Sequence, residues 1–174
     1  TLEINPEHPQ PQPNVGPQFS GVALGEDGEP YCVDKSMNMT SADVKETLMG
    51  LMPLIQERLK FLTEAAEMVH FMFTEPAVPP ADQIIPKRID AAKTKEVLEA
   101  AKEFVAAVSE TDHEGAENFA KAKAEELGIK LGDFMMPIRM AVTGSRVSPP
   151  LIGSIHVLGK ERSLKRIERT IATL

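Results

Sequence analysis

The sequence is short of cysteine, aromatic residues and long apolar runs, and each shortage excludes a class of protein. Its 174 residues include one cysteine, Cys32, which excludes an internal disulfide framework and fits a reducing, cytoplasmic location. Tryptophan is absent and aromatic residues make up 5% of the chain, so aliphatic side chains and nine methionines must form the core. That composition suits packed helices better than a β-sandwich. No apolar run approaches the roughly 18 residues of a membrane span, and we expect no membrane partner.

The chain opens on a polar, Pro-rich stretch without an initial methionine. This opening is unlike a signal peptide, and it suggests a fragment or a processed protein.

The residue patterns that carry catalysis are also missing. The four histidines have no metal-ligand spacing to one another or to Cys32. They are His8, His70, His113 and His156. No Gly-rich phosphate loop is present, and Gly144 with Ser145 lacks the second glycine and the preceding strand of a nucleophile elbow. The sequence therefore predicts no catalytic residue, metal site or cofactor in this chain, which leaves recognition as its function.

Charge is distributed unevenly along the chain. The net charge is −7, yet residues 129–174 contain eight basic and three acidic side chains, a local balance of +5. The remainder, residues 1–128, therefore carries −12. A basic end on an acidic body can face phosphate locally, although a solvated helix surface would show the same pattern.

The chain is expected to be all-α, with two small helical bundles after a Pro-rich segment. Residues 1–38 are predicted to be extended and poorly ordered, or to form a small β-hairpin around Asp27 and Gly28. The remaining predicted units are a first helical subdomain at 39–76, a Pro-rich linker at 77–90 and a second helical subdomain at 91–174.

Apolar periodicity and capping residues predict the individual helices. Thr40 or Ser41 is expected to cap a short first helix, and Pro53 to open the second. Ser148 is expected to cap a helix that has Pro149 in its first position. The glycines expected to end helices are Gly128, Gly144 and Gly159. The helices after the first are expected at 53–73, 91–109, 113–127, 132–143, 149–158 and 160–172.

The stretch 139–151 has features of a recognition surface. Its prolines stiffen the loop, so little entropy is lost when a ligand is bound. Arg139 can stack on a base or donate two parallel hydrogen bonds to one, and Leu151 can pack on a splayed base. A helix that starts after Ser148 offers N–H groups to a phosphate or a base edge. By themselves, these residues also fit an ordinary capped helical hairpin.

Two separated patches of sequence resemble a known family in their residues, order and spacing. The first patch is Leu51–Leu62 followed by Phe71–Glu75, which ends in Phe-Thr-Glu. The second patch comprises Lys130–Phe134, Pro137–Ser145, Ser148–Leu151 and Leu158–Arg162. Together they resemble the anticodon-binding region of bacterial-type glutamyl-tRNA synthetases, over residues 41–174.

The resemblance implies an α-helical cage around the anticodon loop of glutamate tRNA, with no DNA partner. Arg58 matches the arginine that inspects the first anticodon base, a residue associated in the family with charging glutamate tRNA only. The positions that match contacts to the other two bases are Arg139, Ser148, Pro149 and Leu151. Weaker contacts to the RNA backbone are expected from Arg146, Lys160, Arg162, Lys165 and Arg166.

The family's catalytic signatures do not occur in this sequence. The His-x-Gly-His motif and the Lys-x-Ser-Lys type of loop are both absent, so ATP and magnesium are expected to act in a separate catalytic domain. Pro150 replaces a glycine found in some relatives and has no N–H to donate to a base. An alternative hypothesis is a non-catalytic helical module for protein–protein interaction or a structural appendage that has lost RNA binding, which the acidic body would suit.

Overall fold

The computed structural model describes residues 21–25, 27–34, 37–59 and 62–174. Its first element is a β-hairpin whose strands, β1 (Val22–Leu24) and β2 (Pro30–Cys32), pair antiparallel. The turn between them contains Gly28 with φ +77°, a left-handed conformation that glycine adopts without strain. The hairpin alternative of the sequence analysis is therefore confirmed, whereas the expectation of disorder for residues 1–20 lies outside the described residues.

Helix α1 (Ser41–Ile55) begins at Thr40, as predicted, and a capping box fixes its start. The Thr40 side chain accepts a hydrogen bond from the Asp43 N–H, and the Asp43 carboxylate accepts one from the Thr40 N–H. The prediction that Pro53 opens a second helix is wrong, because α1 continues through it to Ile55. The missing N–H of Pro53 removes one hydrogen bond only two residues before the helix ends, and its ring is exposed.

The following helix, α2 (Leu62–Phe73), ends at the predicted place but starts later than predicted. The remaining helices are α3 (Ala81–Ile84), α4 (Ala91–Glu110), α5 (His113–Glu126), α6 (Leu131–Thr143), α7 (Leu151–Leu158) and α8 (Lys160–Ile171). The all-α expectation is confirmed, since the small hairpin is the only sheet in the described part of the chain. The short helix α3 lies in the predicted linker and was not predicted.

The start of α7 differs from its prediction. Its N-cap is Pro150, which makes no side-chain capping bond, so Ser148 is not the cap and Pro149 is not in the first turn. The Ser148 hydroxyl does not cap α7 because it accepts a hydrogen bond from Arg139, which lies on α6. By contrast, α6 ends at Gly144 with φ +70°, as predicted, and α5 is capped by Asp112.

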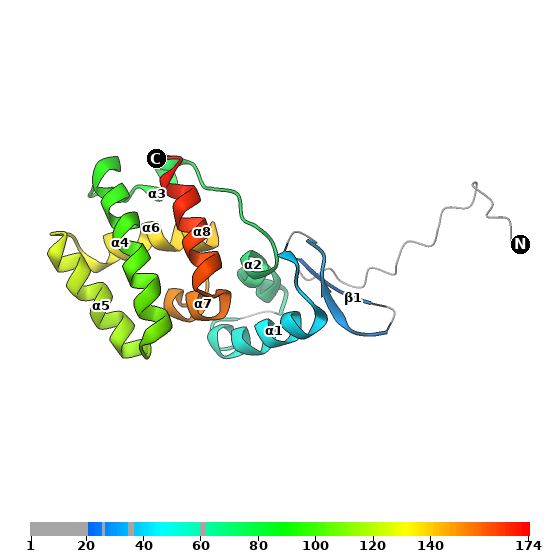
Figure 1. Ribbon diagram of the computed structural model, residues 1–174. Coiled ribbons are helices and arrows are strands. Elements are labelled where there is room, and N and C mark those ends of the chain that lie inside the picture. The colour runs from blue at the N-terminus through cyan, green and yellow to red at the C-terminus, as the bar shows by residue number, and fades with distance from the viewer. Residues whose placement is uncertain (1–20, 26, 35–36, 60–61) are drawn as a thin grey trace, which may run out of the picture.

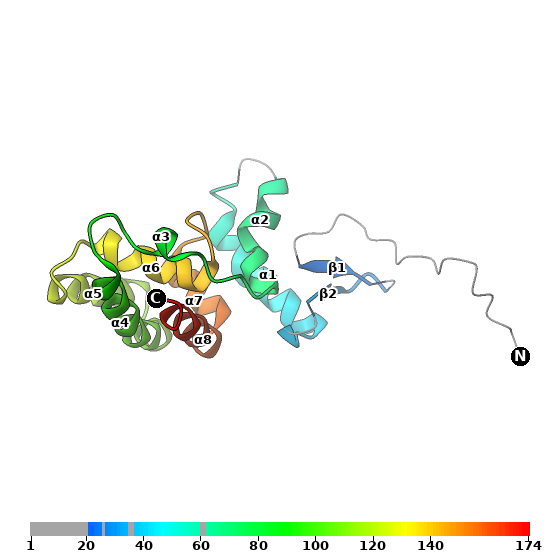
Figure 2. The same cartoon turned by 90° about the horizontal axis from the view of Figure 1, so that it is seen from above.

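Figure 1 shows α1, α2 and the hairpin on one side of the molecule and the helices from α3 to α8 on the other. Figure 2, at right angles, shows the same division. Yet one connected apolar core runs from Val22 in the hairpin through α1 and α2 to Ile167 in α8. Near its centre, the ring of Phe104 contacts that of Phe134 edge-on, with centroids 6.0 Å apart. The proposed boundary between the two subdomains stays a prediction.

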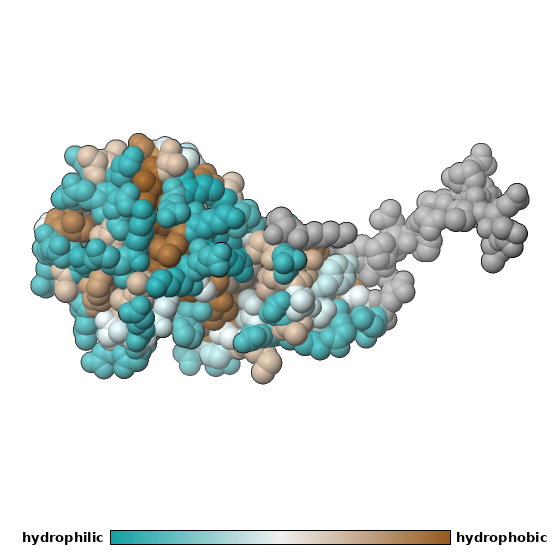
Figure 3. All heavy atoms as spheres, viewed as in Figure 1, coloured by the Kyte–Doolittle hydropathy of each residue, from teal (hydrophilic) through white to brown (hydrophobic). Residues whose placement is uncertain are grey.

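Two helices approach each other closely where α1 meets α7. A Cβ added at Gly153 of α7 would lie 2.6 Å from the Leu54 side chain of α1, so glycine permits this distance. The face of the molecule in Figure 3 is mainly hydrophilic, with narrow apolar strips between the helices. In the described part of the chain, no helix combines the length and apolar character needed to cross a bilayer.

Candidate nucleic-acid interface

Arg139 lies on α6 and holds the loop that leads into α7. Its Nη1 donates hydrogen bonds to the Pro149 carbonyl at 3.0 Å and to the Ser148 carbonyl at 3.5 Å, and it also contacts the Ser148 hydroxyl. At the start of the loop, the Thr143 hydroxyl donates a hydrogen bond to the Arg139 carbonyl at 2.9 Å. The loop is therefore folded back on α6, and the guanidinium is held in one orientation.

The guanidinium of Arg139 keeps donors for a ligand. All hydrogen bonds between its side chain and the described residues are made through Nη1, so these residues leave Nε and Nη2 unused. Arginine carries five N–H donors in a fixed fork that matches two acceptors side by side. Arg139 can thus hold its own loop with one nitrogen and present donors to a base edge or a phosphate with the others.

Arg58 lies close enough to Arg139 to repel it. Burial lowers the pKa of Arg139, and the positive charge of Arg58 lowers that pKa further. Arg58 is exposed in the turn after α1, where its N–H donates to the Ile55 carbonyl at 2.8 Å. The structure therefore brings together the two arginines that the sequence analysis took from separate patches. Two neighbouring cations, one partly desolvated, favour an anionic or electron-rich ligand between them.

The other residues that were predicted to contact bases are buried, and two of them, Ser148 and Pro149, bond to Arg139. Ser148 is 6% exposed and Leu151 is 2% exposed, and Pro149 is also buried. The Ser148 hydroxyl donates to the Pro149 carbonyl at 3.1 Å. In this conformation Leu151 has no free face on which a splayed base could pack, which corrects that expectation. Its side chain belongs to the core, because α7 turns its first residue inward.

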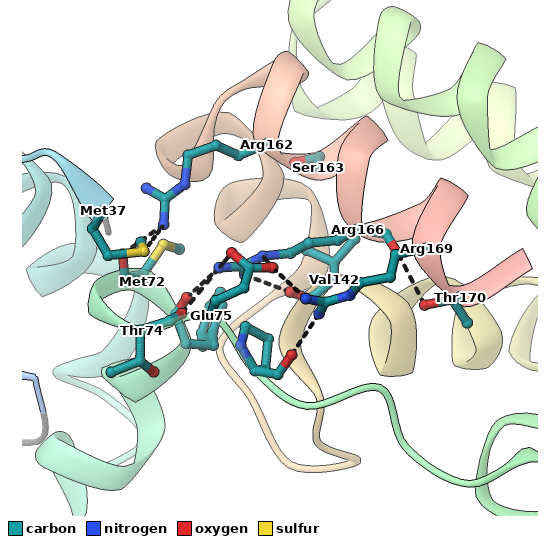
Figure 4. A network of polar contacts seen from close by, with 12 residues as sticks. Met37, Met72, Thr74, Glu75, Val142, Arg162, Ser163, Arg166, Arg169 and Thr170 are labelled. Atoms are coloured by element: carbon teal, nitrogen blue, oxygen red, sulfur yellow. Dashed lines mark hydrogen bonds and ion pairs between the residues drawn. The ribbon is translucent and has the colours of Figure 1, made fainter. Parts of the chain in front are cut away.

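Arg166 contradicts the prediction of a backbone phosphate contact. It is 1% exposed, and its guanidinium donates to the carbonyls of Val142 at 2.7 Å, Phe71 at 2.8 Å and Thr74 at 3.1 Å. It also contacts the Glu75 carboxylate at 3.2 Å. Burial lowers the pKa of Arg166 to about 10 although Glu75 opposes the shift. Figure 4 shows the side chain reaching from α8 to the end of α2. A phosphate cannot reach it without displacing these carbonyls.

The remaining predicted basic residues divide between interior and surface. Arg162 is partly buried and donates to the Met72 carbonyl at 2.9 Å, so it too is occupied inside the protein. Lys165 is exposed, and Lys160 is exposed with Glu110 at 3.9 Å. Arg146 is exposed and donates to the Gln83 carbonyl at 3.4 Å. The side chains available to an RNA backbone are therefore Lys160, Lys165 and Arg146.

No metal site or reactive thiol competes with this interpretation among the described residues. They contain no group of three or more His, Cys, Asp or Glu side chains that could hold a metal ion. The Cys32 thiol is buried and donates to the Phe73 carbonyl at 3.1 Å. Burial raises the pKa of Cys32, so the unreactive thiol form dominates at neutral pH.

Sequence reasoning missed Glu75 and the role of the arginines around it. The signal was present in the spacing of Arg162, Arg166 and Arg169, which puts the three on one face of α8. That face directs the three side chains toward Glu75 and the end of α2, as Figure 4 shows. This partial signal shows that the three arginines share a face, but it does not show that the face meets the end of α2.

Comparison with known proteins identifies the family. The family model described as "Anticodon binding domain" matches residues 24–171. A glutamate–tRNA ligase of Treponema denticola is 58% identical over 129 residues, which are 74% of this chain and 25% of that protein. One of Treponema pallidum (strain Nichols) is 46% identical over 127 residues, which are 73% of this chain and 24% of that protein. The chain thus spans about a quarter of the length of these curated relatives.

A solved structure supports the fold alone. The crystal structure of a glutamate tRNA ligase from Elizabethkingia meningosepticum matches with a TM-score of 0.58 and 22% sequence identity. The match covers 80% of this chain and 31% of that chain. Taken with the match over residues 24–171, these findings show that the chain belongs to the family of anticodon-binding domains.

Proposed function

We propose that this chain is the anticodon-binding part of a glutamate–tRNA ligase and helps select glutamate tRNA for aminoacylation. The observation that carries the proposal is the approach of Arg58, in the turn after α1, to Arg139 of α6, which brings two cations from separate parts of the sequence together. The ligase names of its relatives support the choice of tRNA. The proposal places the protein in the cytoplasm, and it assigns ATP and magnesium to a catalytic part outside this chain.

The two arginines would act differently on the anticodon. Arg58 is exposed and would reach the edge of the first base, where a bidentate contact discriminates by about 1–3 kcal/mol. Arg139 is held by its loop, so it loses little conformational freedom when it stacks on or bonds to a second base. Ser148 and Pro149 would act by holding that guanidinium, while Arg146, Lys160 and Lys165 would contact phosphates. Base contacts would give selectivity, and phosphate contacts affinity.

The test is binding of this chain to a labelled glutamate anticodon stem-loop and to the same loop with its first anticodon base changed. We expect the chain to prefer the cognate loop, and Arg58→Ala to lower that preference about 5- to 150-fold, the range that corresponds to 1–3 kcal/mol. Arg88→Ala is the matched control, because Arg88 is an exposed arginine in the segment before α4. Its loss should leave the preference unchanged.

Three results would contradict the proposal in different ways. Equal binding of both loops with a steep dependence on salt would leave only a nonspecific basic surface. No binding at low salt would instead favour the protein–protein or structural role, which the acidic balance of residues 1–128 suits. Equal losses for the two loops in Arg139→Lys would remove the base-reading role of Arg139, since lysine keeps the charge but not the fork.

A further inference from the structure

The C-terminal end of α2 is capped by side chains from other parts of the chain. The last carbonyls of a helix have no partner within the helix, and they form its negative end. Four consecutive carbonyls at this end accept bonds from three side chains. The bonds are Arg166 to Phe71 at 2.8 Å, Arg162 to Met72 at 2.9 Å, Cys32 to Phe73 at 3.1 Å and Arg166 to Thr74 at 3.1 Å. Two of the three donors come from α8.

We call Arg162, Arg166 and Arg169 the arginine clamp. Figure 4 shows all three reaching from one face of α8 toward the end of α2 and Glu75. Arg169 contacts the Glu75 carboxylate at 3.1 Å and also donates to the carbonyl of the next residue, Pro76. The chain immediately after α2 is therefore held by the same face of α8. Cations at a helix C-terminus interact favourably with its dipole, so geometry and charge agree.

The clamp also reaches the helix that carries Arg139. Arg166 donates through Nη1 to the Val142 carbonyl at 2.7 Å, in the last turn of α6 and three residues after Arg139. Through Nη2 the same guanidinium donates to the end of α2. One buried side chain thus joins the ends of α2 and α6. In the sequence, α2 comes after the turn that contains Arg58, so the clamp ties the helix that follows Arg58 to the helix that carries Arg139.

From these contacts we infer that Arg162 and Arg166 are positioning residues for anticodon reading, because they fix α2 to α6 and α8 and thereby set the separation of Arg58 from Arg139. The inference rests on the proposed function, since it concerns how the two arginines meet one RNA loop. Besides the shared apolar core, a further anchor of this half of the molecule is the close contact of Leu54 with Gly153. That contact packs α1 against α7, whereas the polar contacts at the end of α2 come mainly from the clamp.

The first arm of the test measures α2 without RNA. Hydrogen exchange of residues 62–73 should be faster in Arg166→Lys and in Arg162→Met than in the unmodified chain. Lysine keeps the charge but cannot donate to the carbonyls of two helices at once. Helix α5 should exchange as before, since it does not contact the clamp, and Arg88→Met should change neither helix. Unchanged exchange in α2 for both clamp variants would overturn the inference.

The second arm separates positioning from general stability by a double-mutant cycle. Arg162→Met alone should lower the preference for the cognate stem-loop about two- to tenfold, a modest coupling for neighbouring sites. In the Arg58→Ala background the same change should lower it no further, because the base-reading group is already gone. The salt dependence of binding should stay the same in Arg162→Met, as expected for a residue that contacts no phosphate.

The outcomes distinguish this inference from the proposed function. If the unmodified chain prefers the cognate loop but the losses from Arg162→Met and Arg58→Ala add, the positioning role is wrong and the proposed function stands. If the unmodified chain shows no preference, the proposed function fails and the positioning role fails with it. Coupled losses together with faster exchange in α2 would support both.

Discussion

Replacing Arg166 with methionine should destabilise the protein far more than replacing its neighbour Lys165. Both residues are basic and adjacent on α8, and the sequence assigned both to the RNA backbone. Arg166 is 1% exposed, whereas Lys165 is exposed to solvent. Methionine fills much of the same volume in each case, so the comparison isolates what the charged groups do.

The size of the effect follows from the partners that Arg166 leaves behind. Two of its bonds, to the carbonyls of Val142 and Phe71, are buried, and each unpaired buried carbonyl costs about 1–3 kcal/mol. The Glu75 carboxylate adds little, because it is 38% exposed and keeps Arg169 at 3.1 Å. Methionine avoids the desolvation of a buried cation, which offsets part of the loss. We expect a net destabilisation of about 2–4 kcal/mol.

The assay is urea unfolding followed by far-UV circular dichroism. Midpoints are compared between variants whose unfolding free energy depends on urea concentration with the same slope. Lys165→Met should lie within about 0.5 kcal/mol of the unmodified chain, as is usual for exposed positions. Arg166→Lys should fall between the two, since one ammonium group cannot serve carbonyls on both α2 and α6. An effect of Arg166→Met below about 1 kcal/mol would show that water or local movement satisfies the carbonyls, and the reasoning about the clamp would be refuted.

Three further predictions concern other parts of the molecule. Gly144→Ala should lower stability by more than Gly128→Ala in thermal unfolding, because both glycines have φ near +70° but a Cβ at Gly144 alone would lie 2.9 Å from Pro76. In both variants, the left-handed backbone conformation alone should lower the free energy of unfolding by about 1–2 kcal/mol. Equal losses in the two variants would contradict the steric contribution of Pro76. Burial raises the pKa of Cys32, so the unfolded thiol ionises first and the free energy of unfolding should fall as pH rises above about 8.5. In Cys32→Ala, the free energy of unfolding should fall less over the same pH range. A pH profile identical to that of the unmodified chain would contradict the role of the Cys32 thiol. Finally, Lys165→Met should weaken binding of cognate and changed stem-loops equally and reduce the slope of log affinity against log salt by about 0.7; a change in preference would argue for a base contact.

The helices that sequence predicted best are those whose ends carry local signals. Helix α5 starts after Asp112, whose carboxylate accepts from the Gly115 N–H at 2.8 Å, and it ends before Gly128 with φ +69°. Both signals act within a few residues, so the sequence pattern contains the whole interaction. Pro53 failed as a signal because the cost of a proline depends on how much helix follows it, and here only two residues follow.

The candidate site was predicted only in part, because several of its contacts join residues that are far apart in the sequence. The resemblance selected Arg58 and Arg139, but only the fold shows that they lie close together. Ser148 was expected to cap its own helix, yet its hydroxyl pairs with Arg139, nine residues earlier. Arg166 was expected to face solvent, yet its partners lie 24 and 95 residues away in the sequence. A carbonyl left free at the end of a distant helix has no sequence signature, so no local pattern could have indicated these pairings.

The arginines of this chain divide by how many of their donors the protein uses. Arg166 directs its Nε and both terminal nitrogens to protein acceptors and is 1% exposed, so it stabilises the fold and is closed to a ligand. Arg139 uses Nη1 alone among the described residues, which orients the fork while two nitrogens stay available. A guanidinium that reads a base must be oriented by some protein bonds and must keep other donors free for the base, and the bonds of Arg139 fit both conditions. Donor use therefore separates structural from recognition arginines more sharply than net charge, which assigns the same +1 to each.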